Sequence, residues 1–214
     1  MTPAAIALTV LASVSAVVHI TAEFRGPRWR VYVCKPLTTG AIIAFAWLAP
    51  DPPSGDYRAL VLAGLVFSLA GDVFLMVPRD LFRAGLASFL VAHGLYIAAF
   101  SRAVGFAAEP LAAIPVIAIA AVLVRILWPH LGAERAPVIV YVAVIATMGW
   151  QALAQWLGTG EPYAIFALAG AAAFLFSDAA LALDRFRGRF ATAPAAILGS
   201  YYVAQWLIAA SIWR

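Results

Sequence analysis

The stretch GLVFSLAGDVFLM (residues 64–76) sets the fold, because it is part of a membrane-length apolar segment that nevertheless contains an aspartate, Asp72. A second stretch, GAAAFLFSDAALAL (residues 170–183), has the same character and contains Asp178. A carboxylate at the centre of a transmembrane helix costs about 2.5 kcal/mol or more on insertion scales. Two such residues therefore indicate a function carried out within a membrane.

The composition excludes a soluble globular protein. The chain has 214 residues, of which 65% are hydrophobic and 11% charged, and its mean hydropathy is +0.96. The single Cys34 excludes an internal disulfide. The net charge of +4 comes from basic residues scattered among short loops, so we interpret it as a topology signal and expect no nucleic-acid partner.

Apolar runs of about 17–22 residues recur along the chain, and each is long enough to cross a bilayer core of about 30 Å. Polar or helix-breaking segments separate them. The pattern predicts an all-α polytopic membrane bundle, with residues 1–214 forming one integral-membrane domain. The eight expected helices lie near residues 3–20, 33–49, 58–77, 83–101, 109–128, 137–157, 163–183 and 194–212.

The distribution of arginine predicts the orientation in a bacterial inner membrane. Nine arginines lie in the loops after the first, third, fifth and seventh helices, against three on the opposite side. These loops should be cytoplasmic and both termini outside. The first span has no basic residue before it, which favours a retained helix over a signal peptide.

This orientation gives the polar residues a common depth. Asp72 and Asp178 each lie about five residues, or about 7 Å, before the cytoplasmic end of their helices. Lys35 opens the second helix from that side, while His93 and Gln205 lie near the middle of the fourth and eighth. We expect a pocket facing the cytoplasmic leaflet, with the two carboxyl groups within about 8 Å of each other because neither should face lipid.

A weak internal repeat relates the two aspartates. A shift of 106 residues aligns Asp72 with Asp178 and Tyr96 with Tyr202. It also aligns Gly64 with Gly170, Leu69 with Leu175 and Leu75 with Leu181. The third and seventh helices would then be equivalent members of two four-helix halves in parallel orientation.

Each polar residue also has a purely structural interpretation. Either aspartate could form a salt bridge with Lys35, and Lys35 could instead extend its ammonium to the interface. His93 and Tyr96 could be a buried hydrogen-bonded pair. The spacing of four residues allows three further packing pairs: His19 with Glu23, Tyr201 with Gln205, and Gln151 with Gln155.

Five short motifs follow one another along the chain. They are Lys35-Pro36, Gly71-Asp72, Gly85-Leu86-x-x-Phe89-x-x-Ala92-His93-x-x-Tyr96, Phe176-Ser177-Asp178-x-x-Leu181-Ala182 and Tyr201-x-x-Ala204-Gln205. Their order, together with the eight spans and the chain length, resembles the YhhN/lysoplasmalogenase family of multispanning membrane proteins from about residue 33 to 210. The resemblance implies hydrolysis of the vinyl-ether bond of a lysoplasmalogen, which releases a fatty aldehyde and a glycerophospho-head group, without a cofactor.

The chemistry of a vinyl ether suits the same residues. Its cleavage needs a carboxylic acid to protonate the β-carbon and a carboxylate to stabilise the resulting cation and activate water. Two carboxyl groups in a low-dielectric pocket can divide these roles, so we assign Asp72 and Asp178 as catalytic without choosing which is the acid. His93 could relay a proton. The expected substrate-binding residues are Lys35, which suits the phosphate, and Tyr96, Tyr201, Gln205 and Ser177.

Two other classes of protein fit the same polar residues. A small proton-coupled transporter or lipid-binding protein would also place paired aspartates and a histidine inside a bundle. A metal-dependent lipid hydrolase would draw on His19, His93, Asp72 and Asp178, but the three histidines have no close metal-binding spacing. We therefore expect no metal, a lysophospholipid and membrane lipids as partners, and leave the oligomeric state open.

Overall fold

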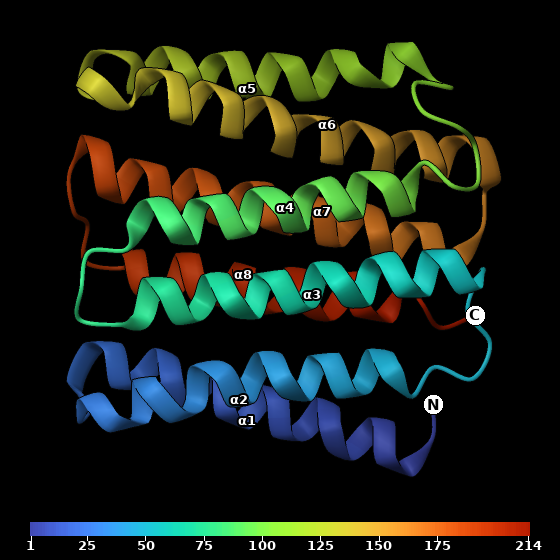
Figure 1. Cartoon of the computed structure of the whole chain (residues 1–214), viewed down its shortest axis with the longest axis horizontal. Helices are drawn as coiled ribbons and strands as arrows, with labels where there is room; N and C mark the ends of the chain where they lie inside the picture. Colours follow the sequence, from blue (N-terminus) through green and yellow to red (C-terminus); the bar gives the residue numbers. More distant parts are fainter.

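The computed structural model describes residues 1–214 and consists of helices without any strand. The expected all-α bundle of eight helices is therefore confirmed (Figure 1). The helices are α1 (Pro3–Arg25), α2 (Arg28–Trp47), α3 (Gly55–Met76), α4 (Phe82–Phe100), α5 (Ala113–Leu127), α6 (Arg135–Thr159), α7 (Pro162–Ala182) and α8 (Ala193–Ala210). Short 3₁₀ turns flank α5, and a π-helical turn, η4 (Leu183–Arg187), follows α7.

Local sequence signals fix the helix ends. The side chains of Thr2 and Ser54 accept hydrogen bonds from the backbone amides of Ala5 and Tyr57, which caps α1 and α3. Gly160 ends α6 in the left-handed conformation, with φ of 63°, a geometry that costs glycine nothing.

Two helices extend further than their apolar runs predict. The helix α1 continues to Arg25 and α2 begins at Arg28, so that both reach beyond the hydrophobic segment at the same end. Helical hydrogen bonding does not stop where the side chains become polar. Glu23 lies in this extension and pairs with His19, one turn earlier in α1, at 3.3 Å.

Seven of the eight helices are long and apolar enough to span a membrane. The exception is α2, which has 20 residues but carries Arg28, Arg30 and Lys35. Its length of about 30 Å, at 1.5 Å per residue, still matches the bilayer core. The protein is thus a polytopic membrane protein in which one helix brings basic residues into the bundle.

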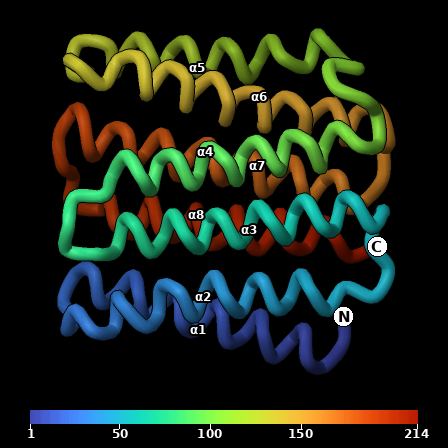
Figure 2. Tube along the Cα trace, in the orientation of Figure 1, coloured from blue at the N-terminus to red at the C-terminus, as the bar shows by residue number.

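The connections after α1, α3, α5 and α7 all lie at one end of the bundle, and both termini lie at the other (Figures 1 and 2). We call the first end the basic end, because nine arginines lie in or beside its connections. The helix α5 lies at the outer edge beside α6, whereas α3, α4, α7 and α8 lie at the centre (Figure 1).

The two halves of the chain pack in the same way. Each helix of α1–α4 packs against the next, as does each helix of α5–α8, and the halves meet through the equivalent pairs α2 with α8 and α6 with α4. A shift of 106 residues carries the starts of α2 and α3 to within one residue of those of α6 and α7. This arrangement fits the two four-helix halves that the repeat predicts.

Glycines allow the closest helix contacts. A Cβ atom on Gly170 of α7 would lie 2.7 Å from the side chain of Ile208 and 3.0 Å from the carbonyl oxygen of Ala204, both on α8. A Cβ on the equivalent Gly64 of α3 would lie 2.3 Å from the ring of Tyr96 on α4. These two glycines therefore allow α3 to approach α4 and α7 to approach α8 closely, as small residues typically do between membrane helices.

Candidate active site

Asp72 is a buried carboxylate with three polar partners. Its Oδ2 accepts hydrogen bonds from the hydroxyl groups of Thr39, at 2.7 Å, and Tyr201, at 2.8 Å. Its Oδ1 lies 3.5 Å from the Nζ of Lys35. The structural alternative for this residue, a salt bridge with Lys35, is therefore present. A cation and two hydroxyl donors are the partners that an ionised carboxylate requires when it is removed from water.

A chain of hydrogen bonds runs from Asp72 into the middle of the bundle. Gln205 donates its amide to the Tyr201 hydroxyl at 2.9 Å, and the hydroxyl of Tyr96 donates to the Gln205 carbonyl at 3.0 Å. The pairing of Tyr201 with Gln205 across one helical turn is thus confirmed. These residues connect α3, α8 and α4, and all of them are buried.

Asp178 has different surroundings. Its Oδ2 accepts a hydrogen bond from the Tyr141 hydroxyl at 2.7 Å, and no cation from lysine or arginine lies beside it. The Nε2 of His93 lies 3.8 Å from the same oxygen. The Asp178 side chain is 14% exposed, against 2% for Asp72. Asp178 is the aspartate that a ligand can reach.

His93 is fully buried, yet neither of its ring nitrogens has a hydrogen-bond partner. Its ring packs edge-on against Phe174, with centroids 4.7 Å apart, and against Tyr141 at 5.5 Å. A buried polar group without a partner costs about 1–3 kcal/mol. Such a group in a native protein calls for an explanation, and a catalytic role is one of them.

Aromatic rings lie between the two aspartate groups. The Phe174 ring neighbours both His93, which lies beside Asp178, and Tyr201, which holds Asp72. The aspartates share no hydrogen-bond partner. The cavity that Asp178 lines does not include Asp72. The structure thus gives each aspartate its own environment, in contrast to the single shared pocket that their equal depth predicts.

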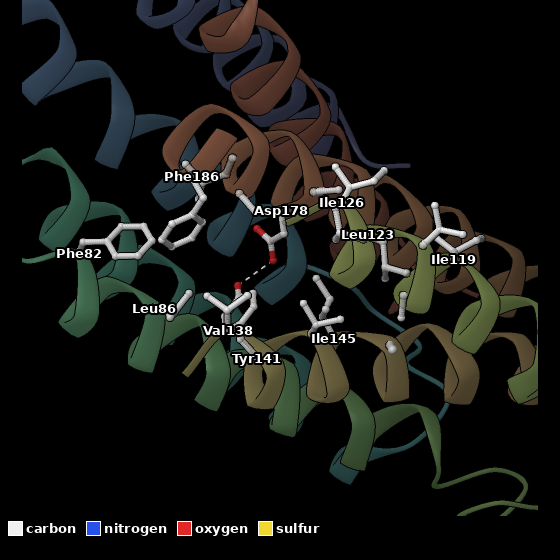
Figure 3. Close-up of a pocket in the computed structure, with 18 residues that line it drawn as sticks. Phe82, Leu86, Ile119, Leu123, Ile126, Val138, Tyr141, Ile145, Asp178 and Phe186 are labelled. Carbon is white, nitrogen blue, oxygen red and sulfur yellow. Dashed lines mark hydrogen bonds between the residues drawn. The ribbon is translucent and has the colours of Figure 1, made fainter. Parts of the chain in front are cut away.

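Asp178 lies in the wall of a cavity that is otherwise lined by apolar side chains and tyrosine (Figure 3). We call this cavity, of about 240 Å³, the apolar groove. The hydrogen bond from Tyr141 to Asp178 crosses the middle of it (Figure 3). Residues of α4, α5, α6 and α7 form its walls, including Leu86, Leu123, Ile126, Val138, Ile145 and Leu175.

A second cavity, of about 540 Å³, lies at the basic end. We call it the polar cavity. It is lined by the cationic side chains of Lys35, Arg79, Arg185 and Arg189 and by the carboxylates of Glu23, Asp80 and Asp184. It shares Phe82 and Leu181 with the apolar groove, so the two cavities adjoin there.

Arg185 and Asp80 form an ion pair at the wall of the polar cavity, with 3.1 Å between the nitrogen and the oxygen. The hydrogen bond and charge of Arg185, together with the Phe82 amide, hold the pKa of the Asp80 carboxyl below its usual range. The Arg185 guanidinium also stacks on the Phe82 ring, 4.7 Å from its centroid. This cluster connects the α3–α4 loop with the turn after α7.

The structure also shows the surroundings of Ser177, an expected substrate-binding residue, and of His19, a candidate metal ligand. The Ser177 hydroxyl donates to the carbonyl of Ile197 on α8 at 2.9 Å, so it serves helix packing rather than facing a cavity. His19 accepts or donates a hydrogen bond with Tyr202 at 2.7 Å and pairs with Glu23, apart from His93 and Asp178. No three His, Cys, Asp or Glu side chains come together as metal ligands would.

Three features of the site escaped the sequence analysis. Thr39 lies one turn after Lys35, so helical periodicity could have placed it beside Asp72. Tyr141 lies 106 residues after Lys35, so the repeat that aligns the aspartates could also have identified it. The arginines of the polar cavity were assigned to topology alone, although their position at the mouth of the bundle gives them a local role as well.

A model described as the YhhN family matches residues 29–212, a segment that contains both aspartates. The chain belongs to the YhhN family. A protein of Escherichia coli O157:H7 named "Uncharacterized membrane protein YhhN" is 29% identical over 199 residues, which cover 93% of this chain and 95% of that relative.

Mammalian relatives carry a more specific name. A Bos taurus protein named lysoplasmalogenase TMEM86A is 38% identical over 157 residues, which cover 71% of this chain and 64% of the relative. The Homo sapiens protein named lysoplasmalogenase TMEM86B is 32% identical over 188 residues, or 87% of this chain and 76% of the relative. No solved structure matches this YhhN-family chain significantly. The match to the family model and these named relatives confirm the resemblance that the sequence motifs indicate.

Proposed function

We propose that this YhhN-family protein is a membrane hydrolase that cleaves the vinyl-ether bond of a lysophospholipid, with Asp178 as the catalytic acid. One observation carries the proposal. A single carboxyl group lies in the wall of an apolar groove that adjoins a cavity lined by one lysine and three arginines together with three carboxylates. The names of the mammalian relatives, lysoplasmalogenase, support the same substrate.

The two cavities match the two parts of such a substrate. An aliphatic chain fits the groove, and a phosphate fits the cations of the polar cavity. The ether bond joins chain and head group, so it should lie where the cavities adjoin, at Phe82 and Leu181. Asp178 precedes Leu181 by three residues, less than one turn of α7, or about 4.5 Å along the helix axis.

The hydrogen bonds distinguish the two carboxyl groups. Asp72 has donors or a cation on both oxygens, and these are partners that favour a carboxylate. The Oδ1 of Asp178 has no partner, so it can carry a proton in the apolar groove. We therefore assign Asp178 as the acid.

In this mechanism, Asp178 transfers its proton to the β-carbon of the vinyl ether and leaves an oxocarbenium ion. The Tyr141 hydroxyl stabilises the carboxylate that forms. Water adds to the carbon bonded to the ether oxygen and gives up a proton to Asp178, which is thereby restored. The hemiacetal then breaks its bond to the glycerol oxygen, which leaves as an alcohol while the chain leaves as an aldehyde. His93, 3.8 Å from Asp178, is placed to carry the proton that the hemiacetal hydroxyl gives up to the leaving glycerol oxygen.

Lys35 has the role of binding phosphate, and Asp72 acts through it. The Lys35 side chain lines the polar cavity and is held 3.5 Å from Asp72. Thr39 and Tyr201 fix the Asp72 carboxylate, while Gln205 and Tyr96 fix Tyr201. Asp72 thus serves as a positioning residue. The excess of arginine at the basic end supports an orientation in which the polar cavity faces the cytoplasmic leaflet of an inner membrane and both termini lie outside.

The decisive experiment measures aldehyde release by the purified protein from a lysoplasmalogen, with an ester lysophospholipid as the control. The reaction should also be run in deuterium oxide. Protonation of the β-carbon predicts one deuterium on the carbon next to the aldehyde group. Release of a fatty acid from the ester control, or an aldehyde without deuterium, would contradict the proposed chemistry. Substrate-dependent proton flux across liposome membranes, without release of aldehyde, would instead support a proton-coupled transporter.

A further inference from the structure

The apolar groove is too short for a whole lipid chain. Its longest run along one transmembrane helix is on α6, from Val138 to Ala146, which is about 12 Å at 1.5 Å per residue. One leaflet of the hydrocarbon core is about 15 Å thick. A chain that spans its leaflet therefore extends beyond the groove.

The end of the groove furthest from the basic end is closed. A Cβ atom on Gly149 of α6 would lie 3.3 Å from a methyl group of Leu175 and 3.4 Å from a methyl group of Val116. Gly149 and Val116 lie about one turn beyond Ala146 and Ile119, the furthest residues of the groove on α6 and α5, and Leu175 is its furthest residue on α7. A chain cannot continue straight along the bundle past this point.

The groove is open on its side. Ile119 and Val122 of α5 line it, yet they are 62% and 58% exposed. The helix α5 packs mainly against α6 and lies at the edge of the bundle (Figure 1). Figure 3 shows Ile119, Leu123 and Ile126 along the side of the groove opposite Tyr141. Since α5 is apolar and spans the membrane, its exposed side chains face lipid.

From these three observations we infer that the groove binds only the first part of the aliphatic chain, next to the ether bond, while the rest passes sideways past α5 into the bilayer. The inference rests on the proposed function for the identity of the head group and bond. It makes Ala146, at the far end of the groove, a specificity-determining residue. The site should discriminate among chains by their structure near the ether bond and tolerate different total lengths.

The test uses a ligand that the protein cannot cleave, a lysophospholipid with a saturated alkyl ether and a photoreactive diazirine. In one probe the diazirine lies in the first part of the chain, close to the ether bond and within the groove, and in the other it lies at the chain terminus. The first should label groove residues of α5, α6 and α7. The second should label exposed α5 residues or surrounding lipid. Labelling of Val116 or Gly149 by the terminal probe would overturn the inference, because these residues lie beyond the closed end and their labelling would require a fully enclosed chain.

A substitution provides the matched control. Ala146→Phe places a ring in the groove, where it competes with the chain for space, and should weaken labelling by the first probe about tenfold or more. Ala143→Phe, on an exposed position of the same helix, should leave it unchanged. The smaller Ala146→Leu repeats the test if the phenylalanine variant does not fold. Equal labelling of wild-type protein and a folded Ala146 variant would refute the groove as the binding site.

The outcomes separate this inference from the proposed reaction. Labelling of the groove without aldehyde release from a lysoplasmalogen would leave the chain site intact and remove the hydrolase. Aldehyde release with labelling elsewhere would leave the hydrolase intact and remove the chain site. Because the probe has no vinyl ether, its binding depends on neither Asp178 nor water attack.

Discussion

The Nζ of Lys35 lies 3.5 Å from the Oδ1 of Asp72, and both residues occur 106 positions before Tyr141 and Asp178, which are hydrogen bonded at 2.7 Å. The same two places on equivalent helices thus hold a cation beside one carboxylate and a hydroxyl beside the other. Lys35 neutralises the charge of the first carboxylate, whereas no lysine or arginine neutralises the second, which is the carboxyl group that we propose as the acid.

Replacement of Asp178 by asparagine should reduce turnover by at least about 100-fold, because general acid–base catalysis typically contributes about 10²–10⁴-fold. Asparagine keeps the size of the side chain but has no acidic proton. KM should change little, since the groove and the polar cavity remain. Aldehyde release at several substrate concentrations measures both. Asp51→Asn, in an exposed loop, is the control, and near-normal turnover of Asp178→Asn would rule out its role as the acid.

Removal of the Lys35 charge should destabilise the protein. Lys35→Met leaves a buried carboxylate without its cation, and breaking a buried ion pair in this way typically costs about 3–5 kcal/mol. The double variant Lys35→Met/Asp72→Asn should recover much of that loss. Thermal unfolding in detergent gives the melting temperatures of the wild-type protein, Lys35→Met and the double variant. If the double variant unfolds at the same temperature as Lys35→Met, the two charges are not coupled.

The two Lys35 variants should also share one kinetic defect. Both lack the ammonium that lines the polar cavity, so both should show a raised KM for a substrate with a phosphate. The increase should be smaller for an analogue without phosphate. An unchanged KM in the well-folded double variant would remove the assignment of Lys35 to the phosphate.

Two buried tyrosines allow a matched comparison. Tyr141→Phe removes the hydroxyl that stabilises the carboxylate formed on Asp178, and should lower kcat about tenfold, since a hydrogen bond to a charged group is worth about 1.5–3 kcal/mol. Tyr96→Phe removes a donor to Gln205 and should mainly lower stability, by about 1 kcal/mol. Parallel assays of kcat and melting temperature test the difference. If Tyr96→Phe lowered kcat and Tyr141→Phe lowered only the stability, the reacting carboxyl group would be that of Asp72 and not that of Asp178.

Two glycines of the second half should respond oppositely to alanine. Gly170→Ala places a methyl group 3.0 Å from the backbone of α8 and should destabilise the protein by about 1–3 kcal/mol. Gly199→Ala has open space around its new methyl group and should be neutral or stabilising by up to about 1 kcal/mol, because alanine favours a helix. Similar melting temperatures for the two variants would show that α7 and α8 need no such close approach.

The sequence predicts the architecture well because the bilayer imposes a strong rule: each spanning segment must satisfy its own backbone hydrogen bonds. All eight helices follow from hydropathy and from breakers such as Pro50 and Pro129. The helix ends at the basic end do not, because α1 and α2 continue through the interface. Local pairs such as Tyr201 with Gln205 follow from periodicity, because their spacing fixes a shared helix face.

The relation between the two aspartates is harder to predict from the sequence. Hydropathy gives depth along the membrane normal, and Asp72 and Asp178 do lie at equivalent positions in their helices. It gives no position around the bundle, which depends on side-chain packing between helices distant in sequence. Phe174 lies beside both His93 and Tyr201 because of such packing. It belongs to a uniformly apolar run, in which nothing distinguishes the phenylalanine that lies between the two aspartate groups.

The parallel packing of the two halves has an evolutionary consequence. Four spans return a chain to the side of the membrane from which it started, so two copies of a four-helix unit can be joined by a short connection, as the loop between α4 and α5 does here. An ancestor of this kind would have been a symmetric homodimer with two identical carboxylate positions. Once fused, the copies no longer had to remain alike. One could become a structural ion pair while the other kept the reactive role.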